Sequence, residues 1–209
     1  MSAPDRNIAA APTPTEKAES ILAAAQRTFL ASGFGAASMD AIAREAGASK
    51  ATVYAYFASK EELFGAVVAR ESERYAEGFT AGELDPGDAE GSLRVTADRF
   101  LRLLLSPDVI AINRIIIGEV ARFPVLAEVF WQAGPERVRL QLENFLNRAA
   151  ETGALQFPDL RLAAGQFASL VRGEIHLRAL LGLGADEAAL ADAAESAIAT
   201  FLRAFGAKR

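Results

Sequence analysis

Hydroxyl, phenol and amine groups are concentrated in the segment from Gly47 to Phe64. No acidic residue lies between Glu45 and Glu61, so this segment can approach phosphate groups without repulsion. Hydroxyls and phenols can hydrogen-bond to phosphate oxygens, and a lysine can reach a phosphate or the acceptor atoms of guanine. The residues that could make such contacts are Ser49, Lys50, Thr52, Tyr54, Tyr56 and Lys60. Their chemistry indicates binding to a nucleic acid.

Each of these residues also has an ordinary structural interpretation. Tyr54 and Tyr56 are two positions apart, so on a helix one of them has to point away from the other, and packing is the alternative for either. Lys60 could be a solvated residue, although a cation in a first helical turn is unfavourable against the helix dipole. Ala51 could be helix filler, or it could touch a thymine methyl group. These alternatives stay open at the level of the sequence.

Two closely spaced helix starts position this segment. Ser49 can cap a helix of about two turns, and Ser59-Lys-Glu-Glu62 fits a capping box. Ser38 can cap the preceding helix, and Gly47 permits a sharp turn between the two. Three helices, the last two joined by such a turn, form a helix-turn-helix unit with a supporting helix. We expect these helices at residues 16–32, 39–46 and 50–56.

Helical periodicity continues through the rest of the chain, and alternation of β-branched residues is scarce. We therefore predict an all-α fold, with an N-terminal helix-turn-helix domain over residues 16–62 and a larger helical domain over residues 63–209. Residues 1–15 are rich in Ala and Pro and are expected to be a disordered lead-in without the pattern of a signal peptide. Further helices are expected at residues 59–80, 91–105, 107–122, 125–132, 135–152, 160–183 and 186–205.

The composition excludes several classes of protein. The net charge is −5, but residues 1–60 carry six Lys or Arg against five Asp or Glu, so the acidic excess lies in the remainder. The chain has no cysteine, and His176 is its single histidine, which argues against thiol catalysis and against most metal sites. No apolar run reaches the eighteen or so residues of a membrane span. We expect a soluble, cytoplasmic protein with no membrane partner and no cofactor.

The N-terminal segment from about Glu16 to Phe64 resembles the DNA-binding domain of TetR-family transcriptional regulators. The matching stretches are Ile21-Leu-Ala-Ala-Ala-Gln-Arg-Thr-Phe29, Gly33-Phe34, Ser38-Met-Asp-Ala-Ile-Ala43, Ala46-Gly-Ala-Ser49 and Thr52-Val-Tyr-Ala-Tyr-Phe-Ala-Ser-Lys-Glu-Glu-Leu63. In the C-terminal part, three further stretches resemble a ligand-sensing domain of regulators of efflux and secondary-metabolism genes. These are Arg122-Phe-Pro-Val-Leu-Ala-Glu-Val-Phe130, Ala133-Gly-Pro-Glu-Arg137 and Leu180-Leu-Gly182.

The resemblance implies a homodimer that places two recognition helices in successive major grooves of a near-palindromic double-stranded DNA operator. It also implies a small-molecule effector that binds the C-terminal domain and releases the DNA. By the same resemblance, Ser38 would meet phosphate, and Arg44 would meet a base or a phosphate. The base edges would be contacted by Ser49, Lys50, Ala51 and Thr52. The contacts to phosphate or flanking bases would come from Tyr54, Tyr56 and Lys60.

An effector pocket is expected among the apolar and aromatic residues of the C-terminal domain. An apolar cavity with few polar groups suits a hydrophobic small molecule. The alternative is that these side chains are ordinary core and that the polar ones form interhelix pairs. The candidate pocket residues are Phe100, Leu104, Ile112, Asn113, Ile116, Glu119, Phe123, Trp131, Phe145, Phe167, Arg172 and His176.

Two C-terminal apolar stripes are candidates for dimerisation. Gly173 would let another helix approach closely, and the last helix runs near heptad spacing. The two helices could instead pair with each other inside one subunit, whereas the family resemblance implies an interface between subunits. The candidate interface residues are Leu170, Gly173, Leu181, Ile198, Phe201 and Phe205.

We therefore interpret the chain as a ligand-responsive DNA-binding transcriptional regulator, with no catalytic residues and no metal site. The family resemblance implies repression as the default, and activation is the alternative that the sequence leaves open. An all-α enzyme is the first rival, but the sequence shows no glycine-rich phosphate loop and no paired carboxylates. A helical adaptor protein without DNA binding is the second rival.

Overall fold

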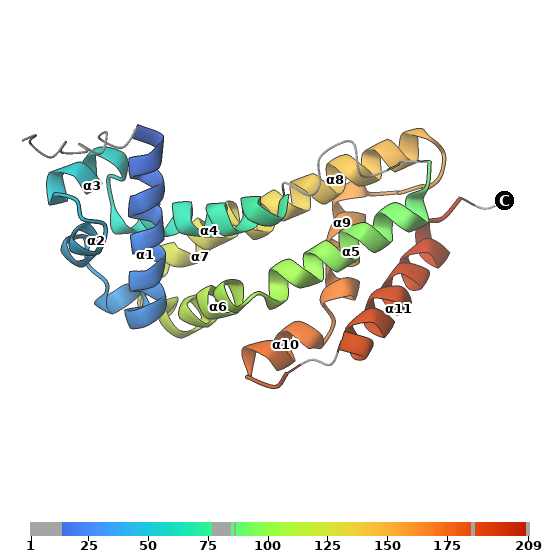
Figure 1. Ribbon diagram of the computed structural model, residues 1–209. Helices are drawn as coiled ribbons and strands as arrows, with labels where there is room; N and C mark the ends of the chain where they lie inside the picture. The colour runs from blue at the N-terminus through green and yellow to red at the C-terminus, as the bar shows by residue number, and fades with distance from the viewer. Residues whose placement is uncertain (1–13, 77–84, 86, 185–186, 208–209) are drawn as a thin grey trace, which may run out of the picture. The chain divides into compact units, whose positions relative to one another are not determined.

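The computed structural model describes residues 14–76, 85, 87–184 and 187–207 of the chain (Figure 1). Within these ranges every regular element is a helix, and the one β feature is an isolated antiparallel bridge between Leu155 and Gly206. The predicted all-α fold class is thereby confirmed. Most of the expected disordered lead-in lies outside the described residues, whereas Pro14 already begins the first helix.

The chain divides into two compact units, Met1–Phe64 and Gly65–Arg209. In the first unit, α1 (Pro14–Ala36) packs against α2 (Met39–Glu45), and α2 packs against α3 (Lys50–Tyr56). The backbone of α1 leaves helical geometry at Gly33, where the sequence predicts the helix to end.

Three phenylalanines form the centre of the first unit. Phe29, Phe34 and Phe64 are buried, and their ring centroids lie 5.2–5.8 Å apart, with two edge-to-face pairs and one stacked pair. Such aromatic pairs stabilise a core beyond the area that they bury. Phe64 lies in α4 (Lys60–Ala76), so the start of α4 belongs to this core.

The two capping serines of the helix-turn-helix act as the sequence predicts. The Ser38 hydroxyl accepts a hydrogen bond from the Ala41 amide at 3.1 Å, and the Ser49 hydroxyl accepts one from the Thr52 amide at 3.0 Å. Gly47 has φ 57°, a left-handed conformation that glycine adopts at low cost, and this allows the turn between α2 and α3.

The capping box at the start of α4 is also present. The Ser59 hydroxyl accepts from the Glu62 amide at 3.0 Å, and the Glu62 carboxylate accepts from the Ala58 amide at 2.8 Å. The predicted end of this helix, near residue 80, lies outside the described residues.

The second unit contains the rest of α4 and seven further helices within its described residues. They are α5 (Ala89–Leu105), α6 (Pro107–Glu119), α7 (Val125–Ala133), α8 (Pro135–Glu151), α9 (Leu160–Arg172), α10 (Ile175–Leu180) and α11 (Glu187–Phe205). α9 lies at the centre of this unit, because it packs against α5, α8 and α11 (Figure 1). The buried core between these helices includes Leu93, Phe145, Leu146, Phe167 and Phe201.

One predicted helix, over residues 160–183, is wrong as a single element. The structure has two helices there, α9 and α10, separated at Gly173, which has φ 45° and ψ −146°. This conformation is rarely adopted by residues with a side chain. The apolar pattern does not reveal the break, because buried residues continue in helical spacing across it, at Phe167, Val171 and Ile175.

Among the described helices, none combines the length and the apolar character needed to cross a membrane.

Candidate nucleic-acid interface and ligand pocket

The outer face of α3 carries most of the predicted DNA-contacting residues. Val53 is fully buried and anchors the helix to the core of the first unit, so the side of this short helix opposite Val53 points outward. Tyr54 is 44% exposed, whereas Tyr56 and Thr52 are partly buried. The exposed predicted residues on α2, α3 and their caps are Ser38, Arg44, Ser49, Lys50, Ala51 and Tyr54. They bring hydroxyl, cationic and aromatic groups to one small unit.

An acidic residue on α2 neutralises the lysine of this surface. The Lys50 ammonium lies 2.9 Å from the Asp40 carboxylate, and both side chains are exposed. The hydrogen bond from Lys50 to Asp40 raises the pKa of Lys50 above its ordinary value. Sequence reasoning misses Asp40 because this residue precedes the acid-free segment along the chain. The predicted contact of Lys50 with DNA would therefore require it to exchange this carboxylate for a phosphate or a base.

Lys60 has a structural position that its sequence context does not reveal. Its ammonium donates hydrogen bonds to the carbonyl oxygens of Phe34 and Ala37, each at 2.8 Å, and lies 4.3 Å from the centre of the Phe34 ring. A cation favours the end of a helix, where carbonyl groups lack helical partners. The ammonium of Lys60 therefore stabilises the C-terminal end of α1 and the residue that follows it, and the expected phosphate contact would require it to give up these carbonyl groups.

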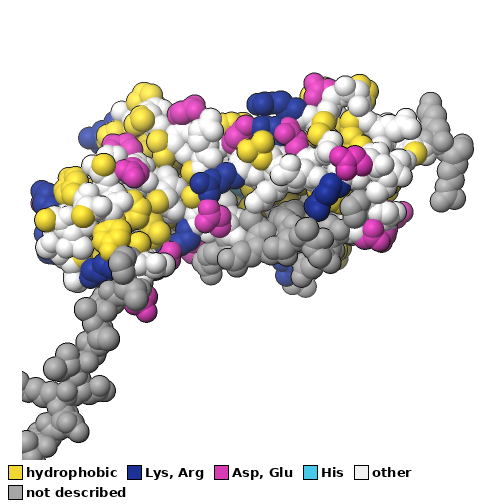
Figure 2. Space-filling view, turned by 90° about the horizontal axis from the view of Figure 1, so that it is seen from above, with side chains coloured by type: hydrophobic (Ala, Val, Ile, Leu, Met, Phe, Trp, Pro, Cys, Tyr) yellow, Lys and Arg dark blue, Asp and Glu magenta, His cyan; other side chains and the backbone are white. Residues whose placement is uncertain are grey.

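Charges of both signs are interspersed on the face of the molecule that Figure 2 shows. In the first unit, Arg27 also pairs with Glu45 at 2.8 Å, and both side chains are exposed. Exposed pairs of this kind contribute little to stability.

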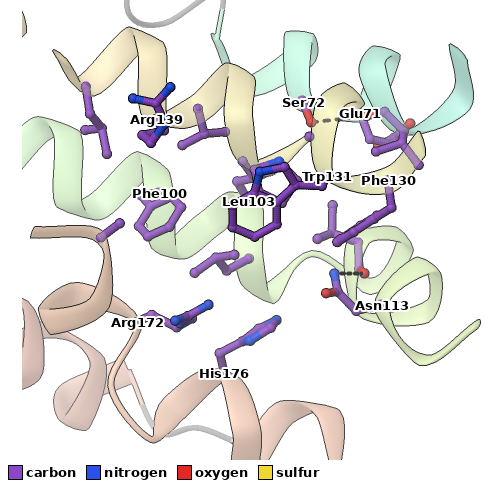
Figure 3. Close-up of a pocket in the computed structure, with 18 of the residues that line it drawn as sticks. Glu71, Ser72, Phe100, Leu103, Asn113, Phe130, Trp131, Arg139, Arg172 and His176 are labelled. Atoms are coloured by element: carbon purple, nitrogen blue, oxygen red, sulfur yellow. Dashed lines mark hydrogen bonds between the residues drawn. The ribbon is translucent and has the colours of Figure 1, made fainter. Parts of the chain in front are cut away.

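A cavity of about 330 Å³ lies in the second unit. Its walls come from α4 to α10 and are mostly apolar, with Trp131 half exposed at 51%. The close-up shows the Trp131 indole and Phe100 on the cavity, with polar side chains on two sides (Figure 3). The apolar lining residues are Val68, Phe100, Leu103, Leu104, Val109, Ile112, Phe130, Trp131, Pro135, Val138, Leu142, Ala164 and Ala168. The volume and the lining are those of a small-molecule site.

Most polar groups of the cavity already have partners. The Ser72 hydroxyl donates to the Val68 carbonyl at 3.1 Å, and the Asn113 amide donates to the Val109 carbonyl at 2.8 Å. The Arg139 guanidinium binds the carboxylates of Glu136 and Glu143. The hydrogen bond from Arg139 lowers the pKa of Glu136, which keeps that pair charged.

His176 is different. It is half-buried beside Arg172, and its Nε2 atom is buried without a hydrogen-bond partner among the residues that the structure describes. Burial, and to a smaller extent the positive charge of Arg172, lower the pKa of His176 below its ordinary value. The imidazole is therefore neutral at neutral pH, and His176 lines the cavity with one buried nitrogen that lacks a partner among the described residues.

The cavity brings together some of the residues that the sequence predicts for it. These are Phe100, Leu104, Ile112, Asn113, Trp131, Arg172 and His176. Five others do not line it, namely Ile116, Glu119, Phe123, Phe145 and Phe167. Phe145 and Phe167 are buried in the core, and Ile116 is buried on α6. Helical periodicity identifies inward positions, but it does not separate a filled core from an open cavity.

Sequence reasoning misses the contribution of α4 to the cavity, which consists of Val68, Glu71 and Ser72. Glu71 is only 3% exposed, and its carboxylate lies 4.0 Å from the guanidinium of Arg70. A buried carboxylate is a signal of a functional site, but the sequence alone does not show that Glu71 is buried.

The candidate interface residues fall into two groups. Leu170, Gly173 and Leu181 are exposed, and they lie with Leu162 and Leu177 on or beside α9 and α10. Ile198 and Phe201 are instead buried inside the subunit, and the Phe205 ring packs 4.8 Å from that of Phe201. These side chains of α11 therefore pack within one subunit, as the alternative interpretation of the sequence allowed. An interface between subunits would instead involve the exposed leucines.

No cluster of three or more His, Asp or Glu side chains suited to a metal ion occurs in the described part of the chain.

Known proteins match both units. Residues 91–207 match the family model for the AefR-like transcriptional repressor C-terminal domain, and residues 21–67 match that for bacterial regulatory proteins of the tetR family. The solved structure of the Flavonoid-responsive Regulator FrrA is 39% identical, with a TM-score of 0.77 over 93% of this chain and 100% of that chain. A TetR-family protein from Mesorhizobium loti MAFF303099 is 28% identical, with a TM-score of 0.78 over 93% of this chain and 100% of that chain.

A curated relative matches over a shorter stretch. The HTH-type transcriptional activator FasR of Mycolicibacterium smegmatis is 35% identical over 85 residues, which are 41% of this chain and 39% of that protein. The match thus spans about two fifths of the length of FasR.

Proposed function

The chain belongs to the TetR family of transcriptional regulators, and from this premise we propose that it is a cytoplasmic repressor that a hydrophobic small molecule releases from its operator. The observation that carries the proposal is an apolar cavity of about 330 Å³ in a unit separate from the one that exposes α3. A DNA-reading surface and a small-molecule site in one chain are the two parts that a ligand-responsive regulator needs.

Repression is favoured by the C-terminal family match, which is described as a transcriptional repressor domain and covers residues 91–207. The relative named an activator matches 41% of the chain. The longer FrrA match also carries a ligand class in its name. We therefore choose a flavone, an aromatic molecule of the flavonoid class, as the first effector to test.

A homodimer is part of the proposal. Exposed leucines on α9, α10 and the residues after them supply an apolar face for a second copy of the chain: Leu162, Leu170, Leu177, Leu181 and Leu183. A two-fold interface uses the same patch on both subunits. The two recognition helices would then read half-sites about 34–36 Å apart.

The coupling between effector and DNA is proposed to run through α4. This helix contributes Phe64 to the core of the first unit, and Val68, Glu71 and Ser72 to the cavity. If effector and operator favour different positions of α4, each weakens the binding of the other by the same factor. The effector needs contacts that differ between the two states, and the α4 side chains in the cavity wall provide them.

DNA binding is tested by fluorescence anisotropy on a labelled fragment from upstream of the gene for this chain, against a scrambled fragment, with a salt titration. We expect tight, sequence-dependent binding that weakens steeply with salt. If both fragments bind weakly and equally, selection from random DNA follows, and failure there would favour the adaptor alternative.

Two variants locate the surface. Lys50→Ala combined with Tyr54→Ala should weaken operator binding about tenfold or more and reduce the salt slope. Arg102→Ala is the matched control, because Arg102 is also an exposed cation paired with a carboxylate, that of Asp98, but it lies in the second unit. The assignment of α3 is refuted if the double variant binds operator as tightly as the control. Addition of a flavone should release the operator from the unaltered protein.

A further inference from the structure

The polar groups of the cavity are segregated by charge. The close-up shows Glu71 and Ser72 on one side, and Arg172 and His176 together on another (Figure 3). Arg139 contributes no available charge, because Glu136 and Glu143 bind its guanidinium.

The side with Arg172 and His176 has unused hydrogen-bonding capacity. Arg172 is exposed and lines the cavity, and no ion pair of its guanidinium is found within the described ranges of the chain. The buried Nε2 atom of His176 lacks a partner in the same part of the structure. A buried nitrogen without a partner is costly in a protein, so a ligand atom that reaches it gains affinity.

We propose that the cavity recognises an aromatic weak acid, whose ionised oxygen accepts hydrogen bonds from Arg172 and His176 while its ring lies against Trp131. This inference rests on the cavity being the effector site, as proposed above. It adds the chemical class of the ligand and the side chains, Arg172 and His176, that bind its ionised oxygen.

The protonation states fit this arrangement. The lowered pKa of His176 leaves a neutral imidazole, which can carry its one proton on Nε2 and donate it to the ligand oxygen. The guanidinium of Arg172 supplies the positive charge. When a phenol binds in its ionised form, its proton passes to the solvent. The other charged groups lining the cavity are Glu71 on α4 and Arg139 on α8 with its two carboxylates.

The location of Arg172 at an exposed edge of the cavity also fits the binding of an anion. Arg172 and Trp131 are both substantially exposed, so they mark where the cavity opens to solvent. An anionic oxygen bound there keeps part of its hydration, whereas a fully buried charge would be costly. The aromatic body can occupy the apolar interior beside Phe100 and Leu103.

The test compares 7-hydroxyflavone, a phenol, with 7-methoxyflavone, in which a methyl group removes the acidic proton. Binding is followed by quenching of Trp131, the single tryptophan of the chain. Ionisation of the bound phenol is followed separately by the long-wavelength absorbance of its phenolate in a pH titration. We expect the bound phenol to ionise at a pH about 1 lower than in buffer, because a nearby cation favours the anion.

Variants assign the effect to its residues. Arg172→Gln should abolish the shift in ionisation and weaken the binding of the phenolate about tenfold, while 7-methoxyflavone binds as before. Arg172→Lys should restore much of the shift, because it keeps the charge. His176→Gln should weaken phenolate binding less than Arg172→Gln. Arg178→Gln removes an exposed cation from α10 that does not line the cavity, and should change nothing.

Two outcomes overturn the inference, and only the second also contradicts the proposed function. If both flavones bind, but the phenol ionises as in buffer or Arg172→Gln leaves its shift intact, acid recognition is wrong and the cavity remains an effector site. If neither flavone quenches Trp131 in the folded protein, the inference fails together with the flavone part of the proposed function.

Discussion

The two units of this protein satisfy their polar groups in contrasting ways. In the first unit, the hydroxyls of Ser38 and Ser49 are exposed, and each binds an amide three residues further along the chain. In the second unit, polar groups from α4, α6, α8, α9 and α10 meet around one cavity, and the Nε2 atom of His176 finds no partner among the described residues. The predicted DNA surface thus comes from one continuous stretch of the chain, residues 38–60, whereas the cavity requires helices that are distant in the sequence.

The contrast extends to what a substitution does. The side chains of the predicted DNA surface are mostly exposed, so their removal changes binding and leaves the core intact. The cavity wall is shared with the core of the second unit, because Leu103, Val138 and Leu142 belong to both. Four experiments test how far the two units and the two roles can be separated.

The largest effect is expected from Phe34→Ala in the core of the first unit. Loss of a fully buried phenylalanine costs about 3–5 kcal/mol, so operator binding should disappear as the first unit unfolds. Quenching of Trp131 by 7-methoxyflavone should persist, because the cavity lies in the second unit. Circular dichroism during thermal unfolding gives the stability of the first unit. Loss of flavone binding in step with operator binding would show that the units do not fold separately.

A change in the backbone of the second unit should come next. Gly173→Ala forces a side chain into φ 45° and ψ −146°, which costs about 1–3 kcal/mol. An added methyl group there meets no atom closer than 3.7 Å, so the cost is conformational and not steric. Gly118→Ala on α6 is the matched control, since its methyl group meets nothing within 4 Å and should raise stability by about 0.5–1 kcal/mol. Urea unfolding compares the two, and equal stabilities would contradict the assigned role of Gly173.

Two lysines of the first unit form a matched pair with opposite roles. Lys60→Met removes two hydrogen bonds to backbone carbonyls and should lower the free energy of unfolding by about 1–2 kcal/mol. Lys50→Met removes an exposed ion pair and should change stability by less than about 0.5 kcal/mol, while it weakens operator binding. Thermal unfolding and anisotropy on the same samples separate the two effects. If Lys60→Met instead weakens operator binding without a loss of stability, Lys60 belongs to the DNA surface as the sequence predicts.

The smallest effect is expected from Asp40→Asn. This change releases Lys50 from its carboxylate and removes a negative charge beside the DNA surface, so operator affinity should rise about threefold at low salt. Asp98→Asn breaks an exposed pair in the second unit and should have no such effect. Anisotropy at two salt concentrations checks both. A loss of affinity in Asp40→Asn would mean that Asp40 positions Lys50 for DNA.

Local signals make the first unit predictable from the sequence. The capping serines, Gly33 and Gly47 act on neighbouring residues, and for this reason the predicted and the observed ends of α3 coincide. The hydrogen bonds of Lys60 escape prediction because its partners, Phe34 and Ala37, lie 26 and 23 residues away. A sequence pattern shows that a lysine is present, but it does not show which carbonyl groups the fold brings to it.

Periodicity makes the second unit predictable as helices but less so as a site. Gly173 ends α9 although the apolar pattern continues across it, because φ at a glycine leaves no trace in hydrophobic spacing. Phe145 and Phe100 both belong to the buried core, yet of the two only Phe100 also lines the cavity. Glu71 and Ser72 escape prediction for a related reason, since burial of a polar side chain is a property of the packed helices.

The continuity of α4 across Phe64 and Gly65 limits how this regulator can be recombined with its relatives. Leu63 and Phe64 are buried on one side of the junction, and Val67 and Val68 are buried on the other. An α-helix turns about 100° per residue, so a chimera with one residue too many would rotate the faces that follow the junction away from those that precede it. Exchange of DNA specificity between such proteins therefore depends on the rotational phase of α4. A chimera keeps both sets of buried side chains in place only if the number of residues in α4 stays the same.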